Sequence, residues 1–123
     1  MGIDFLIYSK ENPQLFKEND PNQYLNWALH DIDFYSVFKL LHINLSENCL
    51  GYWCPEQVEH MYEMIKLLNE DPHKGLYDGW TKEELEDHMI EDINEAIKLK
   101  DDIKKLCDYF NFLVKNKAYI RII

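Results

Sequence analysis

Residues Thr81–Asn116 read TKEELEDHMIEDINEAIKLKDDIKKLCDYFNFLVKN, a stretch that contains no glycine and no proline. Thr81 and Glu84 form a capping box, in which each side chain satisfies a backbone N–H of the first helical turn. Apolar residues recur at steps of three and four, which keeps them on one face of an α-helix. They are Leu85, Met89, Ile93, Ala96, Leu99, Ile103, Leu106, Phe110 and Leu113. The pattern predicts a helix over Thr81–Asn116.

The length of this helix raises a question about its path. A straight helix over Thr81–Asn116 would extend about 54 Å, which exceeds the width of a small domain. It must therefore either project from the body or break, and the charge-rich segment Lys98–Asp102 is the expected break. Beyond it, the apolar residues point to nearly every side of the helix, which predicts a buried end. They are Leu106, Cys107, Tyr109, Phe110, Phe112, Leu113 and Val114.

Two further helices are predicted upstream. Asp33 is placed as the N-cap of one, Pro55 suits the first position of the other, and Asp71-Pro72 ends that second helix. Their apolar stripes are Phe34, Val37, Phe38 and Leu41, and Val58, Met61, Tyr62, Ile65 and Leu68. The chain therefore has three main helices.

Segments with strand-like composition lie mainly at the chain ends. Ile3–Tyr8 (IDFLIY) and Ala118–Ile123 (AYIRII) are rich in apolar and β-branched residues, and we expect them to pair. Tyr24–Leu29 (YLNWAL) is interpreted as a second strand, and Leu50–Cys54 as a short strand or the lead into the next helix. The expected fold is α+β and predominantly helical. Its very long or broken C-terminal helix and two other helices pack with a small sheet that includes both terminal strands.

Composition restricts the possible partners. The chain has 123 residues, a single domain over 1–123, and 46% of them are hydrophobic, enough for a core. The net charge of −10 disfavours binding to nucleic acid or to anionic membranes. No signal peptide and no apolar run of about 20 residues is present, so we expect a cytoplasmic protein with reduced cysteines.

A metal site is one alternative. His60 and His88 each lie on a helix with a carboxylate four residues before and three after; these are Glu56, Glu63, Glu84 and Glu91. Two facing helices of this kind could hold a transition metal in a small metal-dependent enzyme or metal sensor. At His60 and His88 the Glu-x-x-His spacing of di-iron bundles is absent, because each helix places its glutamate four residues before the histidine, and no His-Glu-x-x-His occurs in the chain. No metal or other cofactor is therefore expected.

Catalytic motifs are also lacking. The sequence has no Gly-x-Ser-x-Gly and no phosphate-binding glycine loop. Cys49 and Cys54 lack a second pair of zinc ligands, and Cys107, on an apolar helix, is interpreted as a buried thiol. A cysteine and a histidine distant in sequence could still meet in space. No catalytic residue is assigned, and the protein is expected not to be an enzyme.

Acidic residues crowd the first half of the long helix. Glu83–Glu95 contains seven carboxylates and no lysine or arginine: Glu83, Glu84, Glu86, Asp87, Glu91, Asp92 and Glu95. Like charges four residues apart destabilise a helix by a few tenths of a kcal/mol, and the helix dipole favours acids only in the first turn. We therefore expect these residues to form a face for a cationic partner. Tyr77 and Trp80, in the preceding loop, are candidate contacts, although Trp80 could instead pack on the first helical turn.

The chain resembles the small acidic immunity or antitoxin proteins of bacterial toxin systems. The resemblance rests on size, charge, the acidic run Glu83–Glu95, and the cadence Phe38–Ile43 (FKLLHI) followed by Gly51-Tyr52-Trp53. It implies a non-enzymatic inhibitor whose carboxylates cover the basic active site of a toxin. A further alternative is a homodimeric structural protein, because acidic and basic halves of one helix suit antiparallel pairing.

Overall fold

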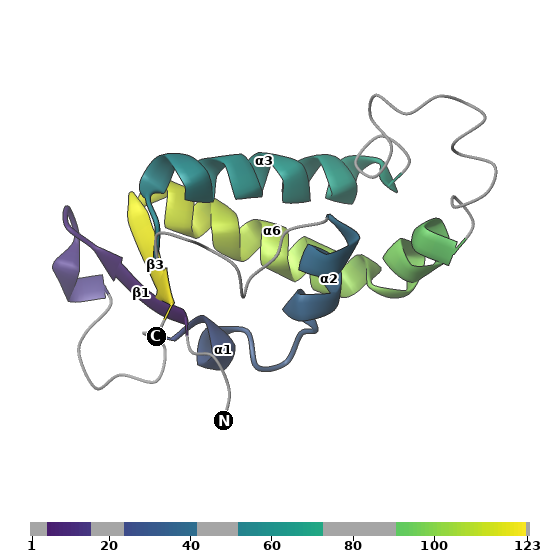
Figure 1. Cartoon of the computed structure of the whole chain (residues 1–123), viewed down its shortest axis with the longest axis horizontal. Coiled ribbons are helices and arrows are strands. Elements are labelled where there is room, and N and C mark those ends of the chain that lie inside the picture. The colour runs from purple at the N-terminus through teal and green to yellow at the C-terminus, as the bar shows by residue number, and fades with distance from the viewer. Residues whose placement is uncertain (1–4, 16–23, 42–51, 73–90, 123) are drawn as a thin grey trace.

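The structure of the chain is a computed structural model that describes residues 5–15, 24–41, 52–72 and 91–122. The described elements are β1 (Phe5–Ser9), the 3-10 helix η1 (Pro13–Leu15), α1 (Leu25–Ala28), α2 (Phe34–Leu40), β2 (Tyr52–Trp53), α3 (Pro55–Glu70), α6 (Lys100–Lys115) and β3 (Ala118–Ile122). Residues 91–98 form a further helical segment before α6. Figure 1 shows α3 and α6 side by side, with the sheet at one end of this pair. The predicted α+β fold, mostly helical, is confirmed.

The sheet has three strands in the order β1-β3-β2, and both neighbouring pairs are antiparallel. Phe5 lies opposite Ile122 and Ser9 opposite Ala118, so the two ends of the chain pair as predicted. Tyr52 and Trp53 add β2 on the other side of β3. The C-terminal strand is therefore the middle strand, hydrogen-bonded on both sides.

One face of the sheet closes the core. Side chains alternate between the faces of a strand, and the inward row consists of Phe5, Ile7, Ala118 and Ile120, all fully buried. Trp53 of β2 joins them, with its ring stacked on Phe5 at a centroid distance of 6.1 Å. This row packs against the apolar faces of the helices.

The ends of α3 lie where its sequence predicted them. Pro55 is the first helical residue, and its fixed φ and missing N–H suit that position. The Cys54 N–H donates to Gln57 Oε1 at 3.0 Å, which satisfies a backbone group that the helix leaves open. The helix stops at Glu70, before Asp71-Pro72. Its buried residues are Val58, Met61, Ile65 and Leu68.

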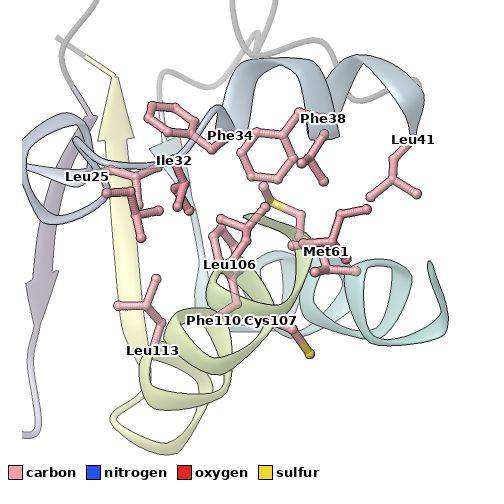
Figure 2. Close-up of a cluster of buried hydrophobic side chains, with 14 of the residues drawn as sticks. Leu25, Ile32, Phe34, Phe38, Leu41, Met61, Leu106, Cys107, Phe110 and Leu113 are labelled. Carbon is pink, nitrogen blue, oxygen red and sulfur yellow. The ribbon is translucent and has the colours of Figure 1, made fainter. Parts of the chain in front are cut away.

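Aromatic side chains join α2 to α6. Figure 2 shows Phe34 and Phe38 projecting from α2 toward Leu106 and Phe110 of α6. The rings of Phe38 and Phe110 meet edge to face, 5.8 Å apart and at 72°, a favourable geometry for two aromatic quadrupoles. The carboxylate of Asp33 accepts from the Ser36 N–H at 3.2 Å, so Asp33 is the predicted N-cap of α2.

The long C-terminal helix breaks at Leu99, inside the predicted segment Lys98–Asp102. Residues 91–98 are helical, Leu99 is a turn, and α6 starts at Lys100. The Leu99 N–H donates to Glu95 O at 3.0 Å, in the segment before the turn, and the Leu99 carbonyl accepts from the Ile103 N–H of α6 at 2.8 Å. The capping box at Thr81 and Glu84 lies outside the described residues.

Two predictions are wrong. The apolar end of the long helix is not buried all round: Phe112 is 40% exposed and Tyr109 and Val114 are half-buried, because the core covers only one face of α6. Tyr24–Leu29 is not a strand. Leu25–Ala28 forms α1, and only Tyr24 makes an isolated bridge, to Leu6 of β1. Leu25 and Leu29, four residues apart, are both buried, a spacing that suits one helical turn.

Candidate functional site

A groove lies between α2 and the helical residues 91–98. Its lining consists of Ser36, Lys39 and Leu40 from α2 and of Glu91, Asp92 and Glu95 from the facing segment, and it encloses about 430 Å³. We call this hollow the acidic groove. Three carboxylates from two turns of helix therefore share one concave surface with a partly apolar wall.

Buried residues on the opposite sides of both helices hold this wall in place. Val37 and Phe38 are fixed in the core, so Ser36 and Leu40, on the other side of α2, face outward. Ala96 and Leu99 are 1% and 8% exposed and attach the facing segment to the core. Their helical phase leaves Glu91 and Glu95, which are one turn apart, on the side toward α2.

The electrostatics of the acidic groove favour cations. Glu91 is exposed, whereas Asp92 and Glu95 are half-buried. Among the described residues of the lining, Lys39 is the one cation, so the described part of the groove sets three carboxylates against one ammonium group. The Ser36 hydroxyl donates to Asp33 at 2.7 Å and is thus already directed toward the start of α2. Ionised carboxylates accept charge-assisted hydrogen bonds from lysine or arginine, and partial burial strengthens such pairs.

The structure describes three of the predicted partner-binding residues, Glu91, Asp92 and Glu95, and it brings all three together. The other six lie outside the described residues; they are Tyr77, Trp80, Glu83, Glu84, Glu86 and Asp87. The sequence interpretation missed the α2 wall. Spacing within α2 would have placed Ser36, Lys39 and Leu40 opposite its apolar stripe, but it contains no signal that they face residues more than fifty positions later.

Two other hollows lack this charge pattern. One, of about 370 Å³, lies at the start of α3 and balances Lys10 and Lys117 against three carboxylates, Glu11, Glu56 and Glu59. There, a hydrogen bond from the Cys54 thiol holds the pKa of Glu56 below its usual value, and the backbone and the Lys117 charge act in the same direction. The other, of about 360 Å³, is mainly apolar and is lined by Trp53, Glu56, Gln57, His60, Met61 and Met64. The acidic groove therefore has the most one-sided charge of the three.

The metal alternative rests on His60 and His88. Glu56, His60 and Glu63 lie exposed on α3. Among the residues that the structure describes, no three His, Cys, Asp or Glu side chains are grouped as metal ligands. His88 lies outside the described residues, so pairing of the two helices through a metal stays a prediction.

The cysteines differ in accessibility. Cys107 is buried, as predicted, and burial is the main cause that raises the pKa of its thiol, with the nearby Asp108 carboxylate acting in the same direction. Cys54 is half-exposed before α3. Both are free thiols, and Cys49 lies outside the described residues. A buried neutral thiol is a poor nucleophile, so Cys107 is a structural residue.

Comparison with known proteins yields no relative: no protein-family model, no curated protein and no solved structure matches the chain. Within the described parts of the chain, none of the helices combines the length and the apolar character required to cross a membrane.

Proposed function

We propose that this chain is a non-enzymatic binding protein that docks a basic protein in the acidic groove, and that it acts as an inhibitor of the immunity or antitoxin type. The observation that supports this most is the convergence of Glu91, Asp92 and Glu95 on one groove with α2. An acidic surface that served only solubility would not require a concave site.

The chemistry of the groove suggests how such a partner would bind. A lysine or arginine side chain can insert its aliphatic stem along Leu40 while its charged end meets the carboxylates. The net charge of −10 adds a long-range attraction for basic proteins, which raises the association rate more than the final affinity. Covering the basic active site of a toxin in this way would inhibit it without any chemical step.

The test measures association kinetics with a dye-labelled oligolysine peptide first, and then with a purified basic candidate toxin. Glu91→Gln, Asp92→Asn and Glu95→Gln are combined in one variant. We expect its association rate to fall about tenfold at low salt. The rate for the unmodified chain should itself fall as the salt concentration rises, because the screening length shrinks to about 10 Å at 0.1 M.

A matched control removes the same number of charges elsewhere. Glu59, Glu63 and Glu70 are exposed on α3, and replacing all three with glutamine should have a much smaller effect on the rate. Lys39→Gln should accelerate binding, because it removes a cation that competes for the carboxylates of the groove. Equal losses in the groove variant and the α3 variant would show that net charge acts alone, and the proposal would fail.

A further inference from the structure

Side chains on the outer face of the sheet are less buried than those on the inner face. Its residues alternate with the buried row and are Leu6 and Tyr8 of β1 with Tyr119 and Arg121 of β3. Arg121 is exposed and the other three are half-buried, whereas the inward residues Phe5, Ile7, Ala118 and Ile120 are fully buried. We call these four outward residues the outer sheet face.

Arg121 is the one arginine among the thirteen basic residues of the chain. It sits on the middle strand, opposite Leu6 on one side and Tyr52 on the other, so its backbone is held by both neighbours. No carboxylate of the described residues forms an ion pair with it. A guanidinium group binds carboxylates through two parallel hydrogen bonds, which lysine cannot reproduce.

Two tyrosines of the outer sheet face stack on each other, and Lys10 lies next to them. The rings of Tyr8 and Tyr119 stack, with centroids 5.0 Å apart and planes at 7°. Lys10 Nζ lies 4.8 Å from the centroid of the Tyr119 ring. These contacts fix an aromatic platform on the same face as Arg121. The charge of Lys10 is offset, because Lys10 and Tyr119 share a hollow with Glu11, Glu56 and Glu59.

We propose that the outer sheet face binds an acidic peptide segment of a partner protein, with Arg121 as its carboxylate-binding residue. The charge of the exposed Arg121 complements a carboxylate of the ligand, and Leu6 with the two tyrosines provides apolar contact area. A nucleic acid fits less well, because its affinity depends on several cations that neutralise successive phosphates, whereas Arg121 is the one cation on the outer sheet face and pairs with a single carboxylate.

This surface is independent of the acidic groove. Residues 91–98 precede α6 and β3 follows it, so the two sites lie at opposite ends of a helix about 24 Å long. Figure 1 shows the sheet at one end of α6 and the short green helix of residues 91–98 at the other. A partner on the sheet would therefore leave the groove open.

The experiment measures fluorescence anisotropy of a short dye-labelled peptide that alternates glutamate and leucine. A peptide that alternates glutamine and leucine serves as the reference ligand. We expect the glutamate peptide to bind and the glutamine peptide not to. Arg121→Gln should weaken binding at least about tenfold. Arg121→Lys should recover only part of it, since the charge is kept and the paired hydrogen bonds are lost.

Lys98→Gln is the matched control, because Lys98 is also exposed and lies on the helical segment at the other end of α6. It should bind the peptide as the unmodified chain does, and circular dichroism should show both variants folded.

Absence of peptide binding, or equal effects of Arg121→Gln and Lys98→Gln, would overturn the proposal. So would a single-stranded oligonucleotide that binds more tightly than the peptide, or a dimer in sedimentation that Arg121→Gln dissociates. Oligolysine binding should be unchanged in Arg121→Gln, so each site fails or succeeds separately.

Discussion

At the residue scale, a few polar side chains hold the corner where β1, α6 and β3 meet. Ser9 is only 3% exposed, and its hydroxyl donates to the Asn116 carbonyl at 2.5 Å while accepting from the Asn12 N–H at 3.1 Å. Asn116 also donates from its amide to Phe112 O at 2.9 Å. A buried hydroxyl with both partners present contributes more than an exposed one.

Replacing Ser9 with alanine should therefore lower the free energy of unfolding by about 1–3 kcal/mol, because the Asn12 N–H and the Asn116 carbonyl each lose a partner. Urea denaturation measures this loss. Ser36→Ala is the matched control, since that hydroxyl bonds to Asp33 in an exposed setting, and its loss should be smaller. Equal losses of unfolding free energy in the two variants would contradict a special contribution of the buried Ser9 hydroxyl.

The buried phenol of Tyr109 should make the free energy of unfolding depend on pH in the alkaline range. Burial raises the pKa of its phenol above the ordinary value of 10.0. The unfolded chain therefore loses this proton near pH 10 while the folded chain retains it, and the stability present below pH 10 falls as the pH rises further. The slope from one such group is at most about 1.4 kcal/mol per pH unit.

Tyr109→Phe should flatten this alkaline decline, as measured by urea denaturation at several pH values above 9. Tyr35→Phe is the control, because Tyr35 is 46% exposed. An unchanged slope in Tyr109→Phe would show that other groups cause the decline.

At the element scale, the α6–β3 junction turns through a residue with unusual backbone geometry. Lys117 has φ of 51°, the single non-glycine residue of the described chain in the left-handed region. This conformation crowds a Cβ atom and costs roughly 1–2 kcal/mol relative to glycine, which outweighs the extra backbone entropy that glycine loses on folding. The turn allows the strand to follow directly on the helix, with the Lys117 N–H bonded to Val114 O at 3.2 Å.

Lys117→Gly should consequently raise the free energy of unfolding by about 0.5–1 kcal/mol. Lys104→Gly, in the exposed middle of α6, should lower it by about 1 kcal/mol. Thermal or urea denaturation of both variants measures this opposite sign. If both substitutions destabilise the protein, the left-handed backbone is not strained in the way described.

At the scale of the whole molecule, the C-terminal strand holds the fold together. It pairs with β1 and β2 on its two sides, and Ala118 and Ile120 are fully buried against the helices. The acidic groove lies before α6, and the exposed Arg121 of the outer sheet face lies after it. The two proposals together predict that partners of opposite charge bind at the same time.

A chain that ends at Lys117 should fail to fold, because it loses both strand pairings and the burial of Ile120, which alone is worth about 2–5 kcal/mol, out of a total stability of about 5–15 kcal/mol. Circular dichroism and amide dispersion in NMR spectra measure the outcome. Arg121→Gln, which changes the same strand only on its exposed side, should remain folded. A folded truncated chain would contradict the central position of β3.

Much of the fold could be predicted because its causes are local. Pro55 and Asp71-Pro72 mark the ends of α3 through backbone geometry alone, and Asp33 caps α2 through a bond to the third residue after it. The apolar positions of α6 repeat with the helical period, so Ile103, Leu106, Phe110 and Leu113 are buried as expected. The prediction for Tyr24–Leu29 was wrong because six apolar-rich residues can form either a short helix or a strand. Packing against the neighbouring elements decides between the two.

Local sequence chemistry, by itself, determined where α2 and α3 begin, where α3 ends, which faces of the main helices are apolar, and that acidic residues gather before α6. The tertiary structure alone decided that β3 lies between β1 and β2, and that Glu91, Asp92 and Glu95 meet α2 across a groove. The physical reason is range: capping and periodicity act over one or two turns. The side that faces another element depends instead on how the whole chain packs to bury its core.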